Sequence, residues 1–543
     1  MKLKNSINIL TVLTATLLFI ILFPHRIFPN VYYVDQSHSS AGDSNPGTEN
    51  QPWLTIQHAA QTAREGDTVF IKKGIYTEKV LPAYSGTAEN PIVYKNFSKD
   101  AVTLTNGSMT GYCFEIHNKK FIIIEGITFK DSDGWINIDS SNYITVNNCI
   151  FSGSRRYNSL KINNGSYNKI LNSKFLKTKP YKLRKTTPYP FIPVGADYIS
   201  IIRNSNYNLI EGNEFHEVPH VAVFIHCWRP GNKAEFNVIR NNIFDNPRWK
   251  AIGIHNLEHT LIENNRFIGK AANFIQFETE KVILRKNIFC KYKDSTNGIP
   301  EKEFRGVFRI WSHYDEYNCP DFARHNRIYN NVFYGNERTI STYKRTLEYP
   351  IFDNIFKNNI FYNNKQTILF HSADYKTVNK NYFLSNVIYG TAPDQKLINL
   401  YGDLFTVTQA QKQMPELYKG NLEVNPGFVD EQNDDYRLTK NSPCIDAGSY
   451  LTKTTDSGTG TQINVEDASY FTDGWGIIKA DLIQIGTNTP VRITNIDYDK
   501  NIISVEKNIS WNTGNEISLP YNGSAPDIGV YEFNSAAESN IKK

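Results

Sequence analysis

One short pattern of apolar and polar positions recurs along the chain: an aliphatic or aromatic residue, two or three variable residues, an asparagine, any residue and a phenylalanine. Spacings between the terminal phenylalanines are 22–24 residues in several cases and 28, 29, 40 and 44 in the others, which predicts a coil repeat with loops inserted in some coils. The copies end at Phe215, Phe244, Phe267, Phe289, Phe333, Phe361 and Phe383, and two degenerate copies end at Phe151 and Phe175.

Each repeat unit contains short β-branched segments and a polar turn, which is too little to bury a core alone, so the units must stack. Strands of successive coils would pair in parallel about 4.8 Å apart, and asparagines at one turn would stack and satisfy backbone groups that the turn exposes. The Leu-x-x-Leu-x-Leu pattern of a leucine-rich repeat is absent. The repeat therefore predicts an all-β fold, a right-handed parallel β-helix solenoid.

The pattern changes at both ends of the repeat region. Ile56, Ala59, Ala60 and Ala63 have helical spacing and predict a short N-terminal helix that caps the first coil. Near the C-terminus, alternating segments and turns predict a small β-barrel or β-sandwich, which is either a binding module or a cap on the end of the solenoid. We expect a β-helix over residues 31–454, the inserted β domain over 455–521, and a closing strand and tail over 522–543.

The segments that flank the repeats resemble a known group of proteins. The opening segment, Tyr32-Tyr33-Val34-Asp35 through Pro52-Trp53-Leu54-Thr55-Ile56-Gln57, resembles the start of secreted proteins of the pectate-lyase-like right-handed parallel β-helix superfamily. The phrases 441–448 (NSPCIDAG) and 525–532 (APDIGVYE) resemble its closing signature, although about 75 residues separate them here. The resemblance implies this fold and a polysaccharide substrate. It implies no catalytic residue, because the fold hosts lyases, hydrolases, epimerases and non-enzymes.

The N-terminus and the charge indicate where the protein acts. Lys2 and Lys4 precede an uncharged run over residues 7–23. This pattern predicts that residues 1–30 are either a cleaved signal peptide or a retained membrane anchor. We expect a secreted or surface-anchored, extracytoplasmic monomer. The net charge is +5 over 543 residues, without a basic block, so nucleic acid is not an expected partner.

The six cysteines have spacings that suit neither a zinc site nor a disulfide scaffold.

A stripe of polar and aromatic side chains is predicted along one strand of each coil, about ten residues before the asparagine. In these strands Val223, Ile225, Ile252, Ile254, Ile275, Phe277, Phe308 and Ile310 would point into the core. The stripe, which would face outward, contains Asp139, Asn163, Phe224, His226, His255, Gln276, Glu278, Arg309, Trp311, Tyr343 and His371. Its spacing is comparable to the rise of a sugar residue, and aromatic rings, amides and acids suit sugars.

The stripe also contains the densest titratable set. We expect either His226 or His255 to be the general base that removes the proton α to a uronate carboxyl group, with Glu278 beside them. Arg309 or Lys250 would neutralise that carboxylate, and Tyr343 would act as an acid. Asp139, Asn163, Phe224, Gln276, Trp311, Tyr343 and His371 would bind substrate. The alternative for this stripe is a polar surface ladder on a stable scaffold.

The loops after Phe175 and Phe289 would wall a groove with basic residues that suit an acidic polysaccharide. They contain Lys177, Lys179, Lys182, Arg184 and Lys185 in the first loop, and Lys291, Lys293, Lys302 and Arg305 in the second. We expect no metal or cofactor. A transition metal on His226, His255 and Glu278 is a weaker alternative, and calcium, with only Glu278 and Glu280 clustered, is another.

Two functions follow as expectations. The first is an exported lyase that cleaves a uronate-containing polysaccharide by β-elimination. The second is a non-catalytic glycan-binding or cell-envelope protein, because the Asp-Pro-His-Asp, Asn-Thr-Asp and Gly-His-Gly signatures of related enzymes are absent.

Overall fold

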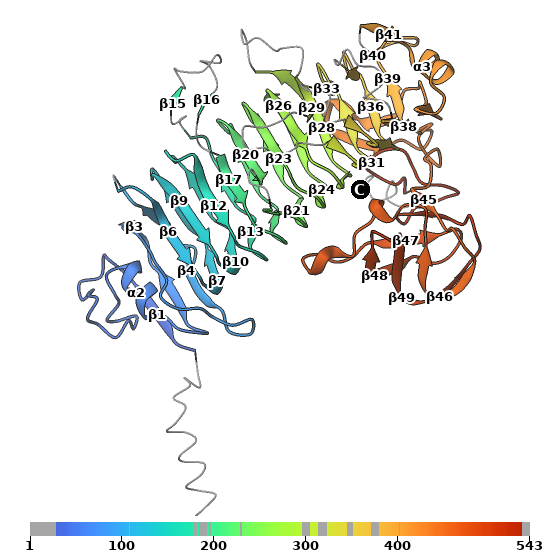
Figure 1. The fold of residues 1–543 in the computed structure, drawn as a ribbon. Coiled ribbons are helices and arrows are strands. Elements are labelled where there is room, and N and C mark those ends of the chain that lie inside the picture. The colour runs from blue at the N-terminus through green and yellow to red at the C-terminus, as the bar shows by residue number, and fades with distance from the viewer. Residues whose placement is uncertain are drawn as a thin grey trace, which may run out of the picture.

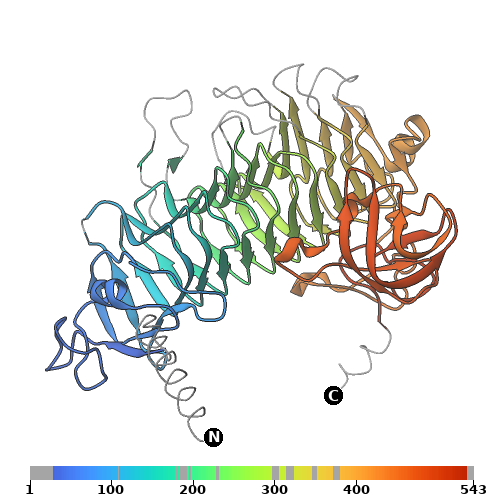
Figure 2. The same cartoon turned by 60° about the horizontal axis from the view of Figure 1, so that its bottom comes forward.

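The computed structural model describes residues 29–534, apart from 108, 179–181, 184–192, 195–196, 228–230, 296–304, 313–322, 345–350, 371–379 and 401. Short strands stack coil on coil into an elongated solenoid, and a lobe of antiparallel strands lies beside its C-terminal half (Figures 1 and 2). The predicted fold class, a right-handed parallel β-helix with a small antiparallel β unit near the C-terminus, is confirmed.

Three long sheets form the walls of the solenoid. The first has 14 strands: β1 (Val31–Val34), β2 (Thr68–Ile71), β4 (Ile92–Asn96), β7 (Lys120–Glu125), β10 (Asn142–Asn147), β13 (Lys169–Leu171), β18 (Leu209–Glu211), β21 (Asn237–Arg240), β24 (Thr260–Glu263), β27 (Val282–Arg285), β31 (Arg327–Tyr329), β35 (Ile355–Lys357), β38 (Tyr382–Leu384) and β42 (Tyr418–Lys419). The second has 12: β3 (Gly74–Thr77), β5 (Val102–Thr105), β8 (Ile127–Lys130), β11 (Ile150–Ser152), β14 (Lys174–Phe175), β19 (Glu214–His216), β22 (Ile243–Asp245), β25 (Arg266–Ala271), β28 (Ile288–Asp294), β32 (Val332–Tyr334), β36 (Ile360–Tyr362) and β39 (Val387–Tyr389).

The third sheet carries the predicted stripe. Its 12 strands are β6 (Tyr112–His117), β9 (Gly134–Asp139), β12 (Asn158–Asn163), β17 (Asp197–Ile202), β20 (Val221–His226), β23 (Lys250–His255), β26 (Asn273–Glu278), β29 (Gly306–Ser312), β33 (Ile340–Lys344), β37 (Ile368–Phe370), β40 (Ile398–Leu400) and β41 (Asp403–Phe405). The strands of successive coils pair in parallel, and only the terminal pair of this sheet, β40 with β41, is antiparallel.

Short elements complete the solenoid. Helix α2 (Ile56–Thr62) buries Ile56, Ala59 and Ala60 at the N-terminal end, as predicted, and the Thr55 hydroxyl caps it by accepting a hydrogen bond from His58 N. The others are α3 (Val407–Gln413), the 3₁₀ helix η2 (Glu431–Asn433), and the two-stranded pairs β15 (Lys182–Leu183) with β16 (Pro193–Val194), β30 (Ala323–Arg324) with β34 (Ile351–Phe352), and β43 (Phe428–Asp430) with β44 (Asp435–Leu438). In the part of the chain that the structure describes, no helix is long and apolar enough to cross a membrane, and the predicted apolar run 7–23 lies outside that part.

Asparagines of successive coils form the predicted ladder. Asn265 Nδ2 donates to Asn287 Oδ1 at 3.0 Å and to Ile239 O at 2.9 Å, while Asn265 Oδ1 accepts from the backbone N–H of Asn242 at 3.0 Å. The residue before each of these asparagines has a left-handed backbone, with φ of +55° at Asn241, +55° at Asn264 and +55° at Lys286. Asparagine tolerates this conformation, which explains the repeated Asn-Asn pairs in the sequence.

The degenerate copies of the repeat keep the same ladder with smaller side chains. Cys149 is buried, and its N–H donates to Ser173 Oγ at 3.0 Å, while Ser173 N–H donates to Asn213 Oδ1 at 2.9 Å. The predicted burial of Cys149 at a ladder position is therefore confirmed.

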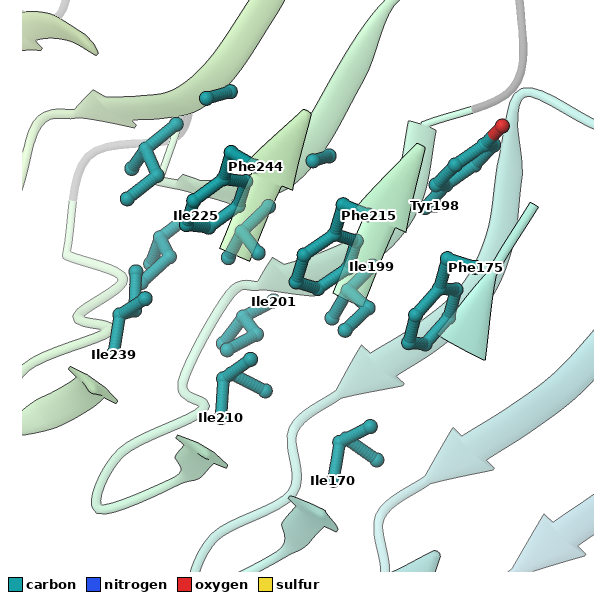
Figure 3. Packing of buried hydrophobic residues seen from close by; sticks show 14 of the residues in the cluster. Ile170, Phe175, Tyr198, Ile199, Ile201, Ile210, Phe215, Ile225, Ile239 and Phe244 are labelled. Carbon is teal, nitrogen blue, oxygen red and sulfur yellow. The ribbon is translucent and has the colours of Figure 1, made fainter. Parts of the chain in front are cut away.

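The phenylalanine that ends each copy of the repeat stacks inside the solenoid. Ring centroids are 4.8 Å apart between Phe175 and Phe215, and 4.9 Å apart between Phe215 and Phe244. Aliphatic side chains such as Ile170, Ile210 and Ile239 pack beside them (Figure 3). Rings and aliphatic residues from all three sheets thus form one continuous core.

We expect Asn265→Ala to lower the free energy of unfolding by about 2–3 kcal/mol, because it leaves the buried Ile239 carbonyl and Asn242 N–H without their partner. Chemical denaturation checks this, with Asn50→Ala, a change at an exposed asparagine, as the control. Equal midpoints for the two variants would contradict the ladder's stabilising role.

The C-terminal lobe is a six-stranded antiparallel sheet. In sheet order its strands are β45 (Thr452–Lys453), β50 (Glu516–Ser518), β47 (Leu482–Ile485), β48 (Val491–Asp497), β49 (Ile502–Trp511) and β46 (Gly458–Asn464), with the 3₁₀ helices η3 (Ala468–Tyr470) and η4 (Gly474–Gly476) beside them. Its core is shared with outward-facing residues of the first sheet, among them Val238, Leu261 and Ile283. The lobe therefore packs directly on one wall of the solenoid.

The two closing phrases meet in space despite their separation in sequence. Gly448 N donates to Pro526 O at 2.8 Å, Ile528 N donates to Cys444 O at 3.0 Å, and Asp446 N donates to Asp527 Oδ1 at 2.8 Å. The lobe thus lies between two segments that pair with each other. The exact limits of the predicted regions, 1–30, 31–454, 455–521 and 522–543, stay predictions.

Candidate functional site

The register predicted for the polar stripe is confirmed. On the third sheet His226 lies opposite His255, and His255 lies opposite Glu278. The preceding residues Ile225 and Ile254 belong to the core, as do the other residues predicted to point inward. A slip of one residue would have reversed these positions, so the alternation in the sequence placed the side chains on the correct face.

The expectation that the stripe faces solvent is wrong at its centre. His226 is 8% exposed, His255 is 9% exposed and Glu278 is fully buried. His255 Nδ1 lies 2.9 Å from Glu278 Oε2, and the Gln276 amide donates to Glu278 Oε1. A carboxylate can be buried when cations and hydrogen-bond donors surround it, so these groups form a buried polar cluster rather than an open ladder.

An aromatic ring lies between the two histidines. The ring centroid of Phe224 is 4.4 Å from that of His226 and 5.1 Å from that of His255. The adjacent coil has Gly253 opposite Phe224, where a Cβ would come within 2.9 Å of Phe224 Cδ2. Glycine at this position therefore makes room for the ring. Phe224 is buried, so this predicted substrate-binding residue is part of the cluster's packing.

Of the predicted cationic residues, Arg309 lies opposite Gln276 on the same sheet. Lys250 begins β23 five residues before His255, so alternation does not place it on the face of His255. Burial lowers the pKa of Lys250 to about 8, an effect that Glu278 opposes and that the charge of Arg309 reinforces. Burial, together with the smaller effect of the neighbouring His255, lowers the pKa of His226 to about 3. His226 is therefore neutral at pH 7.

The remaining predicted residues extend the stripe in both directions. Asp139 lies opposite Asn163, whose amide donates to Asp139 Oδ1, and His117 Nδ1 is 3.4 Å from Asp139 Oδ2. Trp311 lies opposite Tyr343 on β29 and β33, although their side chains are outside the described part of the structure. His371 also lies outside the described residues.

The stripe is not continuous, because a coil was missed in the sequence. Strand β17 places Ile202 between Asn163 and His226, so Asp139 and Asn163 are separated from the central cluster. The same coil contributes the fully buried Asp197, whose Oδ1 is 2.5 Å from His220 Nδ1. The 40-residue spacing between Phe175 and Phe215 was the signal that could have revealed this coil.

Three of the basic residues predicted to wall a groove form ion pairs within the protein. Lys177 pairs with Glu217 at 2.6 Å, Lys291 pairs with Asp434 at 2.9 Å, and the largely buried Arg305 lies 3.6 Å from Asp294. Their charges are thus compensated within the protein. Lys293 is exposed, and the other predicted wall residues lie outside the described part or have side chains that it leaves out, namely Lys179, Lys182, Arg184, Lys185 and Lys302.

No metal centre emerges among the residues that the structure describes, where no three His, Cys, Asp or Glu side chains are arranged to hold an ion. Glu280, one of the two acids considered for calcium, forms an ion pair with Arg324 at 2.7 Å.

The low pKa of His226 predicts acid sensitivity. In the unfolded chain His226 has the ordinary histidine pKa of 6.5, whereas in the folded protein its pKa is about 3. Between these two pH values the unfolded chain binds a proton that the folded protein does not bind, so the free energy of unfolding decreases as the pH falls. We expect His226→Gln to reduce the difference in unfolding free energy between pH 7.5 and pH 4.5 by about 1–3 kcal/mol. Urea denaturation at both pH values measures it, with His216→Gln as the control on the second sheet. An unchanged pH dependence in His226→Gln would contradict the assignment.

Comparison with known proteins supports this fold. Residues 32–180 match the family model described as Pel9A-like, right handed beta helix region. The uncharacterized protein YwoF of Bacillus subtilis (strain 168) is 32% identical over 129 residues, which are 23% of this chain and 26% of that protein, so the match spans about a quarter of its length.

Two solved structures have similar folds at low sequence identity. The complex of XylC with xylose has a TM-score of 0.51 and 12% identity, covering 90% of this chain and 99% of that chain. Pectate lyase Pel9A has a TM-score of 0.43 and 14% identity, covering 94% of this chain and 98% of that chain. The match over residues 32–180 confirms the resemblance to pectate-lyase-like β-helices inferred from the sequence, and the likeness to XylC shows the fold alone.

Proposed function

We propose that the protein is an exported polysaccharide-active β-helix protein, and that it is a lyase that cleaves a uronate-containing polysaccharide by β-elimination. One observation carries this proposal: the contact between His255 Nδ1 and Glu278 Oε2, 2.9 Å apart, lies on the sheet face that also carries Arg309. β-Elimination needs a base for the proton α to the carboxyl group and positive charge beside that carboxylate.

The two histidines have different roles in this proposal. His226, with a pKa near 3, is too weak a base to hold a proton at neutral pH. His255 is the base, because Glu278 faces its Nδ1 and stabilises the charge that the ring acquires. The proton exchanged with substrate is then carried on Nε2, a buried atom that substrate binding has to expose. Glu278 acts as the residue that orients the imidazole.

The cations complete the reaction. Arg309, and Lys250 in its protonated form, neutralise the substrate carboxylate, which stabilises the carbanion formed when C5 loses its proton. The bond from C4 to the leaving oxygen then breaks, a C4=C5 double bond forms, and the leaving oxygen takes up a proton. Tyr343, the donor expected from the sequence, lies three strands from His255, about 14 Å at the usual strand spacing, so water supplies this proton in the proposal.

A second function is favoured by a specific observation. The central side chains are at most 9% exposed, which also suits a scaffold whose surfaces bind glycans without cleaving them. In either case the proposed partner is an acidic polysaccharide. Residues 1–30 would direct export, either as a cleaved signal or as an anchor over residues 7–23.

A substrate panel separates the two functions. Pectate, alginate, hyaluronan and chondroitin are each incubated with the protein, and unsaturated uronate products are followed by their ultraviolet absorbance. The lyase proposal expects a rise in absorbance with at least one substrate. Binding without product would support the glycan-binding alternative, and the absence of both would reject an acidic polysaccharide as the partner.

A further inference from the structure

The C-terminal lobe contains a hollow at one end of its sheet. The hollow has a volume of about 630 Å³, which is within the usual range for small-molecule sites. It lies where the start of β46, the turn after β47 and the end of β49 come together. All the residues that line it are described by the structure, and none of them is acidic or basic.

A tryptophan held in a fixed orientation forms part of the wall. Trp511 Nε1 donates to Asp456 Oδ1 at 3.0 Å. On the adjacent strand, a Cβ at Gly458 would lie 2.8 Å from Trp511 Cζ2, so glycine allows the indole to lie against the backbone. Trp511 is 7% exposed and belongs to the core of the lobe, so it contributes a small apolar part of the lining.

Hydroxyl and amide groups supply the polar part of the lining. The hydroxyls of Thr459 and Ser510 are 2.8 Å apart on neighbouring strands. Asn488 Nδ2 donates to Ser510 O at 3.0 Å, which leaves its Oδ1 as an acceptor, and Asn515 Oδ1 accepts from Asn512 N at 2.8 Å, which leaves its amide hydrogens as donors. The hollow thus offers both donors and acceptors without a charge.

We propose that this hollow binds a neutral, hydroxyl-rich glycan. An anionic sugar would find no cation in the lining, and the Asp456 carboxylate behind Trp511 would repel it. An apolar ligand would leave the hydroxyl and amide groups unpaired. The hydroxyls of a neutral sugar match the uncharged donors and acceptors of the lining. This site is separate from the polar stripe, and its function does not depend on lyase activity.

The full-length protein is titrated by calorimetry with cellohexaose, xylohexaose, mannohexaose and maltohexaose, and with hexagalacturonate as the charged comparison. The test variant Thr459→Val/Ser510→Ala removes the hydroxyl pair and keeps the strand shape. The matched control, Thr461→Val, changes an exposed threonine two residues along the same strand that does not line the hollow. Thermal unfolding verifies that both variants are folded.

We expect at least one neutral hexaose to bind, and the double variant to weaken that binding about tenfold while Thr461→Val leaves it unchanged. Hexagalacturonate should not compete for this site. The proposal is overturned if no neutral hexaose binds, or if the double variant binds as tightly as the unaltered protein, which would place the sugar elsewhere. It is also overturned if Thr461→Val weakens binding equally.

Discussion

The variant His255→Ala should lose between about 10²-fold and 10⁴-fold in kcat on whichever uronate polysaccharide the protein cleaves, which is the usual contribution of a general base. His255 is the imidazole whose Nδ1 lies 2.9 Å from Glu278 Oε2, and no other group in the proposed reaction replaces it. Initial rates of unsaturated product formation measure the loss.

The chain offers a matched control for this variant. His216 on the second sheet also lies near carboxylates, with Nδ1 3.2 Å from Asp245 Oδ2 and Nε2 3.3 Å from Glu214 Oε2, but it is outside the stripe. We expect His216→Ala to keep the activity. Glu278→Gln, which keeps the side-chain volume, should lower kcat more than it raises KM. Full activity in a folded His255→Ala protein would reject His255 as the base.

The variant Arg285→Ala should lower the free energy of unfolding by about 3–5 kcal/mol, because it removes the cation that pairs with Asp481 and one of the two that pair with Glu263. The Arg285 side chain is 4% exposed and binds Asp481 of the lobe through two hydrogen bonds of 2.7 Å. Its Nε also donates to Glu263 Oε2 on the first sheet at 2.9 Å. One guanidinium therefore joins the solenoid to the lobe.

A surface ion pair of the same lobe is the control. Lys453 and Glu516 are 3.6 Å apart, and their side chains are 48% and 42% exposed. Lys453→Ala should cost no more than about 1 kcal/mol. Chemical denaturation compares the two variants, and limited proteolysis tests whether Arg285→Ala makes the lobe easier to release. A cost for Arg285→Ala as small as that for Lys453→Ala would contradict the role of the buried pair.

The features that repeat in the sequence were the ones that could be predicted. The asparagine ladder and the stacked phenylalanines occur once in each coil, so their spacing identified the solenoid directly. Strict alternation then placed Ile225 and Ile254 in the core and put His226 and His255 on the other face. Local periodicity carries this information, and it is independent of the loops.

Features that depend on distant segments could not be predicted. Arg285 and Asp481 are 196 residues apart in sequence and follow no repeat, so their contact has no local signal. The burial of His226 and Glu278 depends on what packs over the strand, which alternation does not report. The coil at β17 was hidden by the long insertion before it, so the pairing of Asp197 with His220 was missed.

A structure of the His255→Ala variant with a bound uronate oligosaccharide tests the central claim most directly. The account predicts that the sugar carboxylate lies within about 4 Å of Arg309 or Lys250, with C5 facing the position vacated by the imidazole. An oligosaccharide bound only away from His226, Glu278 and Arg309 would contradict the assignment of this cluster as the site of uronate chemistry.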